Sequence, residues 1–120
     1  MITKFGIVLA AGSLLGSMQA HADEYQRWIE VVNRGNAAIE AVYITTIDER
    51  DGHRWGNVLG GYLIHPGYSR VVEPNYHGGY CRFDIMVTYE NGSQVPIWNI
   101  NLCEAVEVDV SDMGYTQVGY

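Results

Sequence analysis

Residues 81–103 constrain the fold of this chain more than any other segment. Cys81 and Cys103 bracket two runs in which apolar and polar residues alternate, and Asn91-Gly92 stands between the runs. Strict alternation places the apolar side chains of a strand on one face. Asn-Gly is a strong signal for a two-residue hairpin turn because both positions tolerate positive φ. The segment therefore predicts a β-hairpin with one apolar face.

A two-residue turn would pair Glu90 with Ser93 and so fix the register of the hairpin. This register places Trp98 and Phe83 in the core, and we expect Tyr43 to join them there. The facing pairs would be Val87–Pro96, Ile85–Trp98, Phe83–Ile100 and Cys81–Leu102.

The two cysteines predict a disulfide that ties the open ends of this hairpin. Cys103 lies one residue past the position that faces Cys81, so a bulge, or a strand ending at Leu102, must turn its sulfur back. A disulfide that closes a loop of this length stabilises a domain by about 3 kcal/mol. Two free thiols or a shared metal are the alternatives, although two cysteines without two further ligands make no zinc site.

Beyond the hairpin, short β-branched and aromatic runs alternate with turn residues roughly every 8–12 positions, which is typical of a sandwich or barrel. Pro66-Gly67 suits the two central positions of a type II turn. We expect an all-β fold, a single antiparallel β-sandwich of immunoglobulin-like size with about seven strands, and a loose tail over residues 111–120. The expected strands are 28–32, 39–47, 62–64, 68–73, 81–90, 93–102 and 106–110.

The N-terminal residues have the three parts of a secretory signal. Lys4 supplies the positive charge, residues 5–18 are mostly apolar, and Ala20-His21-Ala22 is an A-x-A cleavage site. We therefore expect a signal peptide over 1–22 and a periplasmic or secreted domain over 23–120. An uncleaved anchor helix is the alternative, but the apolar stretch is shorter than the ~20 residues of a membrane span.

Charge limits the classes of partner. The 120-residue chain carries a formal net charge of −7, and cleavage after Ala22 would remove its single lysine, Lys4. An acidic domain repels phosphate backbones, so we expect no nucleic acid partner. The favoured partner is a protein or a small ligand, and charge would steer a cationic one.

The pattern resembles a group of small, mostly uncharacterised bacterial proteins, secreted or periplasmic, with a signal peptide and one β-sandwich. The resemblance implies a fold and a compartment, and it implies no activity. It covers roughly residues 28–110 and is carried by Asn33, Ile39, Tyr43, Trp55-Gly56, Leu59-Gly60, Pro66-Gly67-x-Ser69, Cys81-x-Phe83-Asp84, Val87, Tyr89, Asn91-Gly92 and Asn101-Leu102-Cys103.

Metal ligands are a weaker hypothesis. The loop histidines His53, His65 and His77 could converge on copper or zinc, since imidazole suits both metals. The acidic loop with Asp48 and Asp51 invites a calcium site, although its spacing is not that of an EF-hand. Glu49, Asp109 and Asp112 are further candidate calcium ligands.

An excess of aromatic residues in loops is the more informative feature. Tyr and Trp are enriched at recognition surfaces because they bury a large area and still donate hydrogen bonds. We therefore expect a non-catalytic binding or interaction protein with no cofactor, and a metal-binding protein or a carbohydrate-binding module are the alternatives. The candidate binding surface is Trp55, Tyr62, Tyr68, Tyr76, His77 and Tyr80.

Overall fold

The computed structural model describes residues 26–49, 55–104 and 107–118, and the predicted signal peptide lies outside these ranges. Within them the chain forms strands, one short 3₁₀ helix, η3 (Ile47–Glu49), and no α-helix, so the all-β prediction is confirmed. No helix in these ranges is long and apolar enough to cross a bilayer. The strands are β2 (Ile29–Asn33), β3 (Ile39–Thr46), β4 (Gly56–Asn57), β5 (Ser69–Val72), β6 (Arg82–Tyr89), β7 (Gln94–Asn101), β8 (Glu107–Ser111) and β9 (Gly114–Val118).

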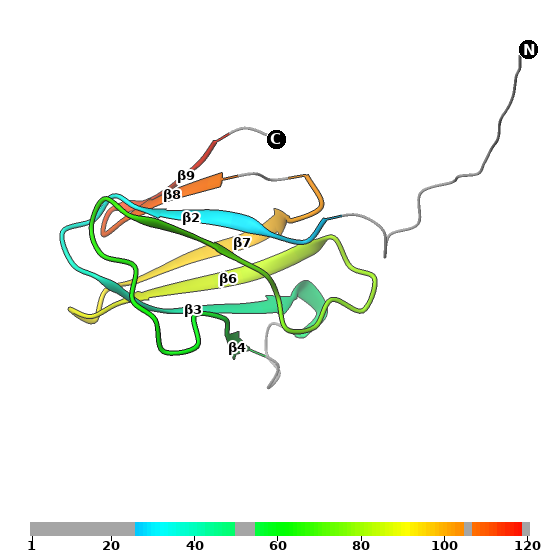
Figure 1. Ribbon diagram of the computed structural model, residues 1–120. Coiled ribbons are helices and arrows are strands. Elements are labelled where there is room, and N and C mark those ends of the chain that lie inside the picture. Colours follow the sequence, from blue (N-terminus) through cyan, green and yellow to red (C-terminus); the bar gives the residue numbers. More distant parts are fainter. Residues whose placement is uncertain (1–25, 50–54, 105–106, 119–120) are drawn as a thin grey trace, which may run out of the picture.

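These strands form two four-stranded sheets packed face to face, with strand orders β5-β2-β8-β9 and β4-β3-β6-β7 (Figure 1). Every strand pair is antiparallel except β2 and β8, which run parallel. Parallel neighbours need a long connection. Here that connection includes the whole β4-β3-β6-β7 sheet.

The core lies between the sheets and is built from the alternating apolar residues of each strand. In β3 and β6, the register pairs Val42 with Val87 and Ile44 with Ile85, and all four side chains are buried. Phe83 is fully buried as predicted. The largest buried apolar side chains of the core are Tyr89, Phe83, Ile29, Ile39, Leu59, Ile64, Ile85, Ile97 and Leu102.

The β6–β7 hairpin forms, but its predicted register is wrong near the turn. The backbone of Tyr89 donates to Ser93, so the loop is one residue longer than the predicted Asn91-Gly92 turn. Ile85 consequently faces Ile97 and not Trp98. The predicted Phe83–Ile100 pair returns after a bulge, where Asn99 adopts a left-handed φ of 58°. The bulge removes the one-residue shift in pairing and leaves Trp98 exposed. The prediction of a core Trp98 is therefore wrong.

The disulfide between Cys81 and Cys103 ties the open end of this hairpin, as predicted. Strand β7 ends at Asn101, and the Leu102 amide still donates to the Cys81 carbonyl, 2.8 Å away. The Asn101 side chain then accepts from the Cys103 amide at 2.9 Å, which turns the chain out of the strand. This turn brings the Cys103 sulfur back to Cys81.

Two other local expectations have different outcomes. The Pro66-Gly67 turn is confirmed, because the Tyr68 amide donates to the His65 carbonyl at 3.0 Å and Gly67 has a φ of 86°. The loose tail expected over residues 111–120 is wrong in its described part, up to residue 118, where the structure shows a strand. Gly114–Val118 forms strand β9, which pairs with β8 at the edge of its sheet.

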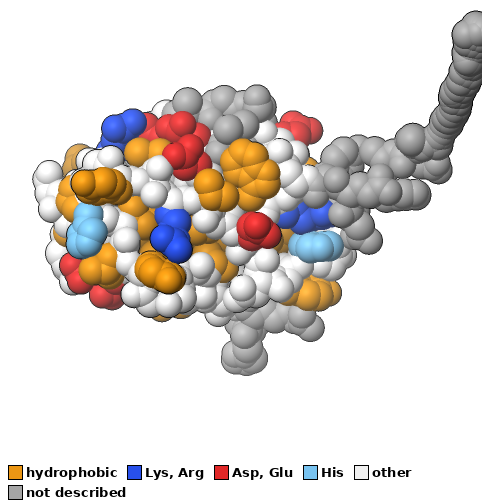
Figure 2. All heavy atoms as spheres, viewed as in Figure 1, with side chains coloured by type: hydrophobic (Ala, Val, Ile, Leu, Met, Phe, Trp, Pro, Cys, Tyr) orange, Lys and Arg blue, Asp and Glu red, His pale blue; other side chains and the backbone are white. Residues whose placement is uncertain are grey.

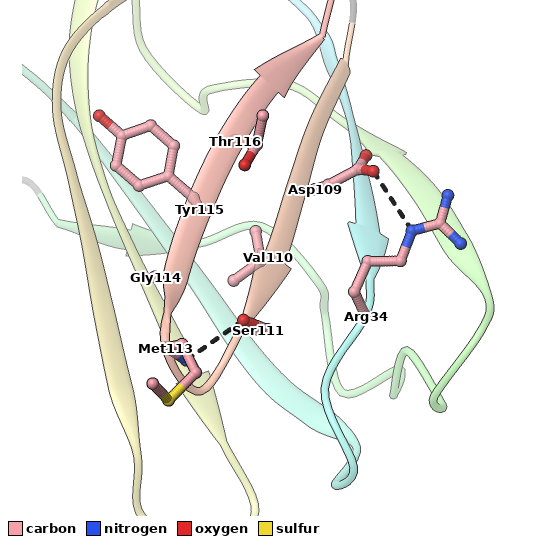
Figure 3. Close-up of a pocket in the computed structure, with 8 residues that line it drawn as sticks. All are labelled: Arg34, Asp109, Val110, Ser111, Met113, Gly114, Tyr115 and Thr116. Carbon is pink, nitrogen blue, oxygen red and sulfur yellow. Dashed lines mark hydrogen bonds and ion pairs between the residues drawn. The ribbon is translucent and has the colours of Figure 1, made fainter.

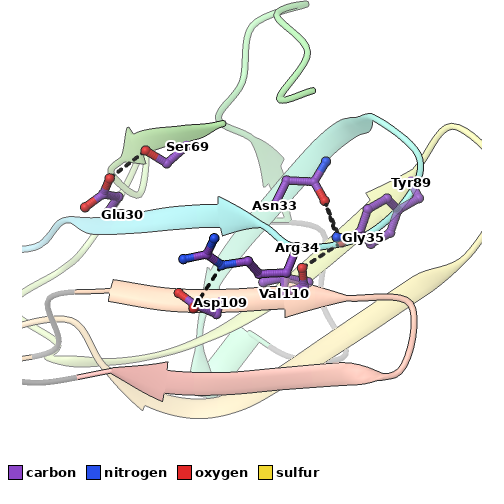
Figure 4. Close-up of polar contacts among 8 residues, drawn as sticks. All are labelled: Glu30, Asn33, Arg34, Gly35, Ser69, Tyr89, Asp109 and Val110. Carbon is purple, nitrogen blue, oxygen red and sulfur yellow. Dashed lines mark hydrogen bonds and ion pairs between the residues drawn. The ribbon is translucent and has the colours of Figure 1, made fainter. Parts of the chain in front are cut away.

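A buried polar network fixes the end of the sandwich opposite the disulfide. The Asn33 side chain donates to the Ile64 carbonyl at 2.8 Å and accepts from the Gly35 amide at 2.8 Å (Figure 4). The Tyr89 hydroxyl lies 3.1 Å from the Asn33 side-chain oxygen and 3.0 Å from the Val110 carbonyl. We call this the Asn33 end of the molecule, and the other the disulfide end. Burial, followed by the charge of Asp112, raises the pKa of Tyr89 to about 12.

Candidate functional site

The outer face of the β4-β3-β6-β7 sheet carries an aromatic cluster. Because Val42 and Ile44 point into the core, the alternation of β3 turns Tyr43 outward. Tyr43 faces Met86 on β6, which in turn faces Pro96 on β7. Tyr43 and Met86 are both half-buried on this outer face.

Two tryptophans stand on the same face. The rings of Trp55 and Trp98 have centroids 6.4 Å apart and planes at 78°, an edge-to-face contact. Trp98 reaches this position because of the bulge in β7, and 46% of its surface remains exposed. Trp55 immediately precedes β4 at the edge of the sheet.

Asp84 and Thr45 face each other on β6 and β3, and both are buried although they lie on the outer side of the sheet. Trp55 and Trp98 flank this pair, because β4 continues the register beside Thr45 and the bulge lies opposite Asp84. The Asp84 carboxylate accepts from the Asn99 amide at 2.8 Å, and so holds the bulge. The tryptophan pair is therefore supported by a buried acid beneath it.

A hollow of about 390 Å³ lies beside Trp55 and is lined by Tyr43, Trp55, Met86 and Gln94. None of these four side chains is charged. We call them, together with Trp98, the tryptophan face. In the register, Gln94 faces Thr88, whose hydroxyl is buried and has no hydrogen-bond partner among the described residues.

A second hollow, about 480 Å³, lies on the other sheet beside the β8–β9 hairpin (Figure 3). Its chemistry is different, because Arg34 and Asp109 form an ion pair at its edge with a nitrogen–oxygen distance of 3.2 Å. The Tyr115 ring projects away from that pair in Figure 3. The Arg34 side chain is 58% exposed and that of Asp109 is 23% exposed, so water reaches the arginine more than its partner.

Carboxylates crowd the outer face of the same sheet. The parallel pairing of β2 and β8 places Glu30 beside Glu107, and Asp109 follows two residues later on β8. A hydrogen bond with Asp109 raises the pKa of Glu107, and desolvation and the negative charges of Asp109 and Glu30 add to the rise. Ser69 donates a hydrogen bond of 2.5 Å to Glu30 (Figure 4). We call Glu30, Glu107 and Asp109 the acidic face.

The structure does not bring the six predicted surface residues together, and only Trp55 belongs to the tryptophan face. Tyr62 and Tyr68 lie towards the Asn33 end, since the Tyr68 carbonyl accepts from the Asn33 amide. They are 60% and 69% exposed, and Arg70 stacks over the Tyr62 ring at 4.2 Å. The molecular face in Figure 2 mixes such apolar side chains with arginine, histidine and acidic ones.

The remaining predicted surface residues lie at the disulfide end. The Tyr80 hydroxyl donates to Asp48 in a short hydrogen bond, and the Tyr80 carbonyl accepts from Arg27 at 2.6 Å. His77 accepts from the Gly79 amide through Nδ1 at 3.0 Å, which orders its own loop. Tyr76 is half-exposed beside this loop.

The predicted metal ligands are also separated. His65 and Asp112 lie at the Asn33 end, whereas His77 and Asp48 lie at the disulfide end, and Asp51 and His53 fall outside the described residues. Asp109 is engaged by Arg34. In the ranges that the structure describes, no group of three histidine, cysteine, aspartate or glutamate side chains could hold a metal ion.

Sequence reasoning placed Tyr43 and Trp98 in the core, which is wrong, and it did not single out Met86 or Gln94. A signal for Tyr43 was present, because Val42 and Ile44 on either side of it define the buried face of β3. For Trp98 no local signal exists, because its exposure depends on the bulge held by Asp84.

The sequence matches no family profile and no curated protein. A solved NMR structure of a protein from Eubacterium rectale has the same overall fold, with a TM-score of 0.53 and 10% sequence identity. The match covers 85% of this chain and 97% of that one. At this identity the likeness is one of fold alone.

Proposed function

We propose that this chain is an exported, non-catalytic binding protein that holds its ligand on the tryptophan face. The observation that supports this most directly is the uncharged aromatic hollow of about 390 Å³ lined by Trp55, whose ring contacts the half-exposed Trp98. Small-molecule sites are typically about 300–1,000 Å³ and lined mainly by apolar and aromatic groups with a few polar ones. Gln94 supplies the polar group here.

A purely structural role explains part of this arrangement. The register places the Trp55–Trp98 contact next to the buried Asp84–Thr45 pair, where the two rings would keep water from that pair. That role does not require a hollow next to the rings, nor does it require Tyr43 and Met86 to extend the apolar surface along the strands. Shielding therefore leaves the hollow and its apolar walls at Tyr43 and Met86 unexplained, and a ligand would fill that space.

Export is supported by the predicted signal peptide and by the disulfide, since disulfides persist mainly in oxidising compartments. We expect expression of the complete 120-residue chain to yield a product that begins at Asp23 outside the cytoplasm. N-terminal sequencing of the fractionated product measures this. An intact N-terminus in the cytoplasmic fraction would contradict it.

Binding is tested by comparing Trp98→Ala with Tyr68→Ala. Both variants remove an exposed aromatic ring, but only the first belongs to the tryptophan face. Immobilised glycans, peptides and whole periplasmic proteins serve as probes for surface plasmon resonance. We expect Trp98→Ala to lose the interactions that the unsubstituted protein makes, and Tyr68→Ala to keep them. The proposal fails if both variants bind like the parent.

A further inference from the structure

Among the described residues, the side chains that line the hollow of the tryptophan face carry no charge, which narrows the ligand class. We infer that this face binds the ring of a neutral sugar, an inference that rests on the proposed function. The lining side chains Tyr43, Trp55, Met86 and Gln94 offer no ion-pair partner to a charged ligand. The net charge of −7 further repels uronic, sialic and sulfated sugars.

A cationic side chain is a less suitable occupant. Cation–π recognition by aromatic rings is strengthened by a nearby carboxylate. Among the described residues, Asp84 is an acid on the same side of the sheet as the rings, but it is fully buried and its carboxylate already accepts the Asn99 amide. The carboxylates of the acidic face lie on the other sheet.

Ring geometry suits a sugar. The faces of aromatic rings carry partial negative charge, and they attract the weakly positive C–H groups on the flat side of a pyranose. Because the planes of Trp55 and Trp98 meet at 78°, a sugar could stack on one ring and touch the edge of the other. Tyr43 and Met86 continue the apolar surface.

Polar groups at the rim match sugar hydroxyls. The Gln94 amide offers two donors and an acceptor, the combination that vicinal hydroxyls require. An uncharged peptide could also pair with Gln94 through its backbone amides, so the test below includes peptide probes beside glycans.

The test uses the protein recovered after expression of the complete chain. A glycan array carrying neutral, acidic and amino sugars is followed by titration of tryptophan emission with the best neutral ligand. We expect neutral glycans to bind, with a Kd that changes less than twofold between 50 and 500 mM NaCl, since screening affects charged pairs only.

Variants locate the site. Trp98→Ala should weaken sugar binding at least tenfold, Trp98→Phe should restore part of it, and Gln94→Ala, at an exposed position, should weaken it about fivefold while folding normally. Tyr68→Ala and Tyr115→Ala are matched controls that should bind like the parent. Near-ultraviolet circular dichroism confirms that each variant is folded.

The outcomes separate the two proposals. An array on which no neutral glycan binds overturns the sugar inference, as does binding that Gln94→Ala and Trp98→Ala leave unchanged. If glycans fail but a peptide or protein probe is lost in Trp98→Ala, the ligand class is wrong and the binding site stands. If Trp98→Ala binds every probe like the parent, both fail.

Discussion

The two sheets share one apolar core, but the carboxylates on their outer faces differ in how far they are exposed to water. On the β5-β2-β8-β9 sheet, the carboxylates of the acidic face are partly exposed, and the exposed Arg34 pairs with Asp109, whose side chain is 23% exposed. On the β4-β3-β6-β7 sheet, Asp84 is fully buried beside two tryptophans. A solvated charge is tolerated at little cost, whereas a buried one must be hydrogen-bonded. The Asp84 carboxylate is therefore fixed by burial and a hydrogen bond, whereas those of the acidic face remain partly in contact with water.

The largest difference in unfolding free energy should be found between two variants that each remove one carboxylate, one from each outer face. Asp84→Ala leaves the Asn99 amide without its acceptor, and we expect a loss of about 1.5–3 kcal/mol of unfolding free energy. Asp109→Ala breaks an exposed ion pair and should cost about 0–1 kcal/mol. Urea unfolding of both variants measures this, and equal losses would remove the distinction between the faces.

The tryptophan pair should show an interaction energy of its own. A double-mutant cycle with Trp55→Ala, Trp98→Ala and the double variant should give a coupling of about 0.5–1.5 kcal/mol, the range for edge-to-face pairs. Chemical denaturation supplies the four free energies. Strict additivity would mean that the rings do not support each other.

A smaller effect is expected from the Thr45 hydroxyl. It is buried without a partner among the described residues, so Thr45→Val keeps the shape and removes an unmet polar group. We expect this variant to be as stable as the parent or up to about 1 kcal/mol more stable. A thermal melt measures the change, and a clear loss of stability would show that the hydroxyl has a partner in the folded protein.

The smallest effect that we expect is the contribution of Glu107, on the acidic face, to the pH dependence of stability. Because the pKa of Glu107 is raised in the folded state, its ionised form disfavours folding, and this penalty disappears as the pH falls through that pKa. Glu107→Gln should therefore be slightly more stable than the parent at neutral pH, with a difference that shrinks towards acid pH. Melts at a series of pH values test this, and a difference that grows in acid would contradict it.

Local patterns predicted the hairpin, the disulfide and the Pro66-Gly67 turn because each depends on residues close together in sequence. The hairpin register failed where a distant contact intervenes, since the Asp84 carboxylate stabilises the bulge that exposes Trp98. The parallel pairing of β2 with β8 left no periodic signal at all. The same holds for the tryptophan face, whose members come from four segments that only the sheet brings side by side.

The parallel pairing of β2 with β8 also affects the order in which the strands pair during synthesis and folding. Strand β2 is the first described strand to be synthesised, but its partner β8 is next to last. Pairings between such distant segments form slowly, whereas the contiguous β6–β7 hairpin can form as soon as it is made. We expect the tryptophan face to assemble early and the β5-β2-β8-β9 sheet to be completed last. Until β8 arrives, β2 presents one bare edge, the state in which a nascent chain is most exposed to wrong strand pairing.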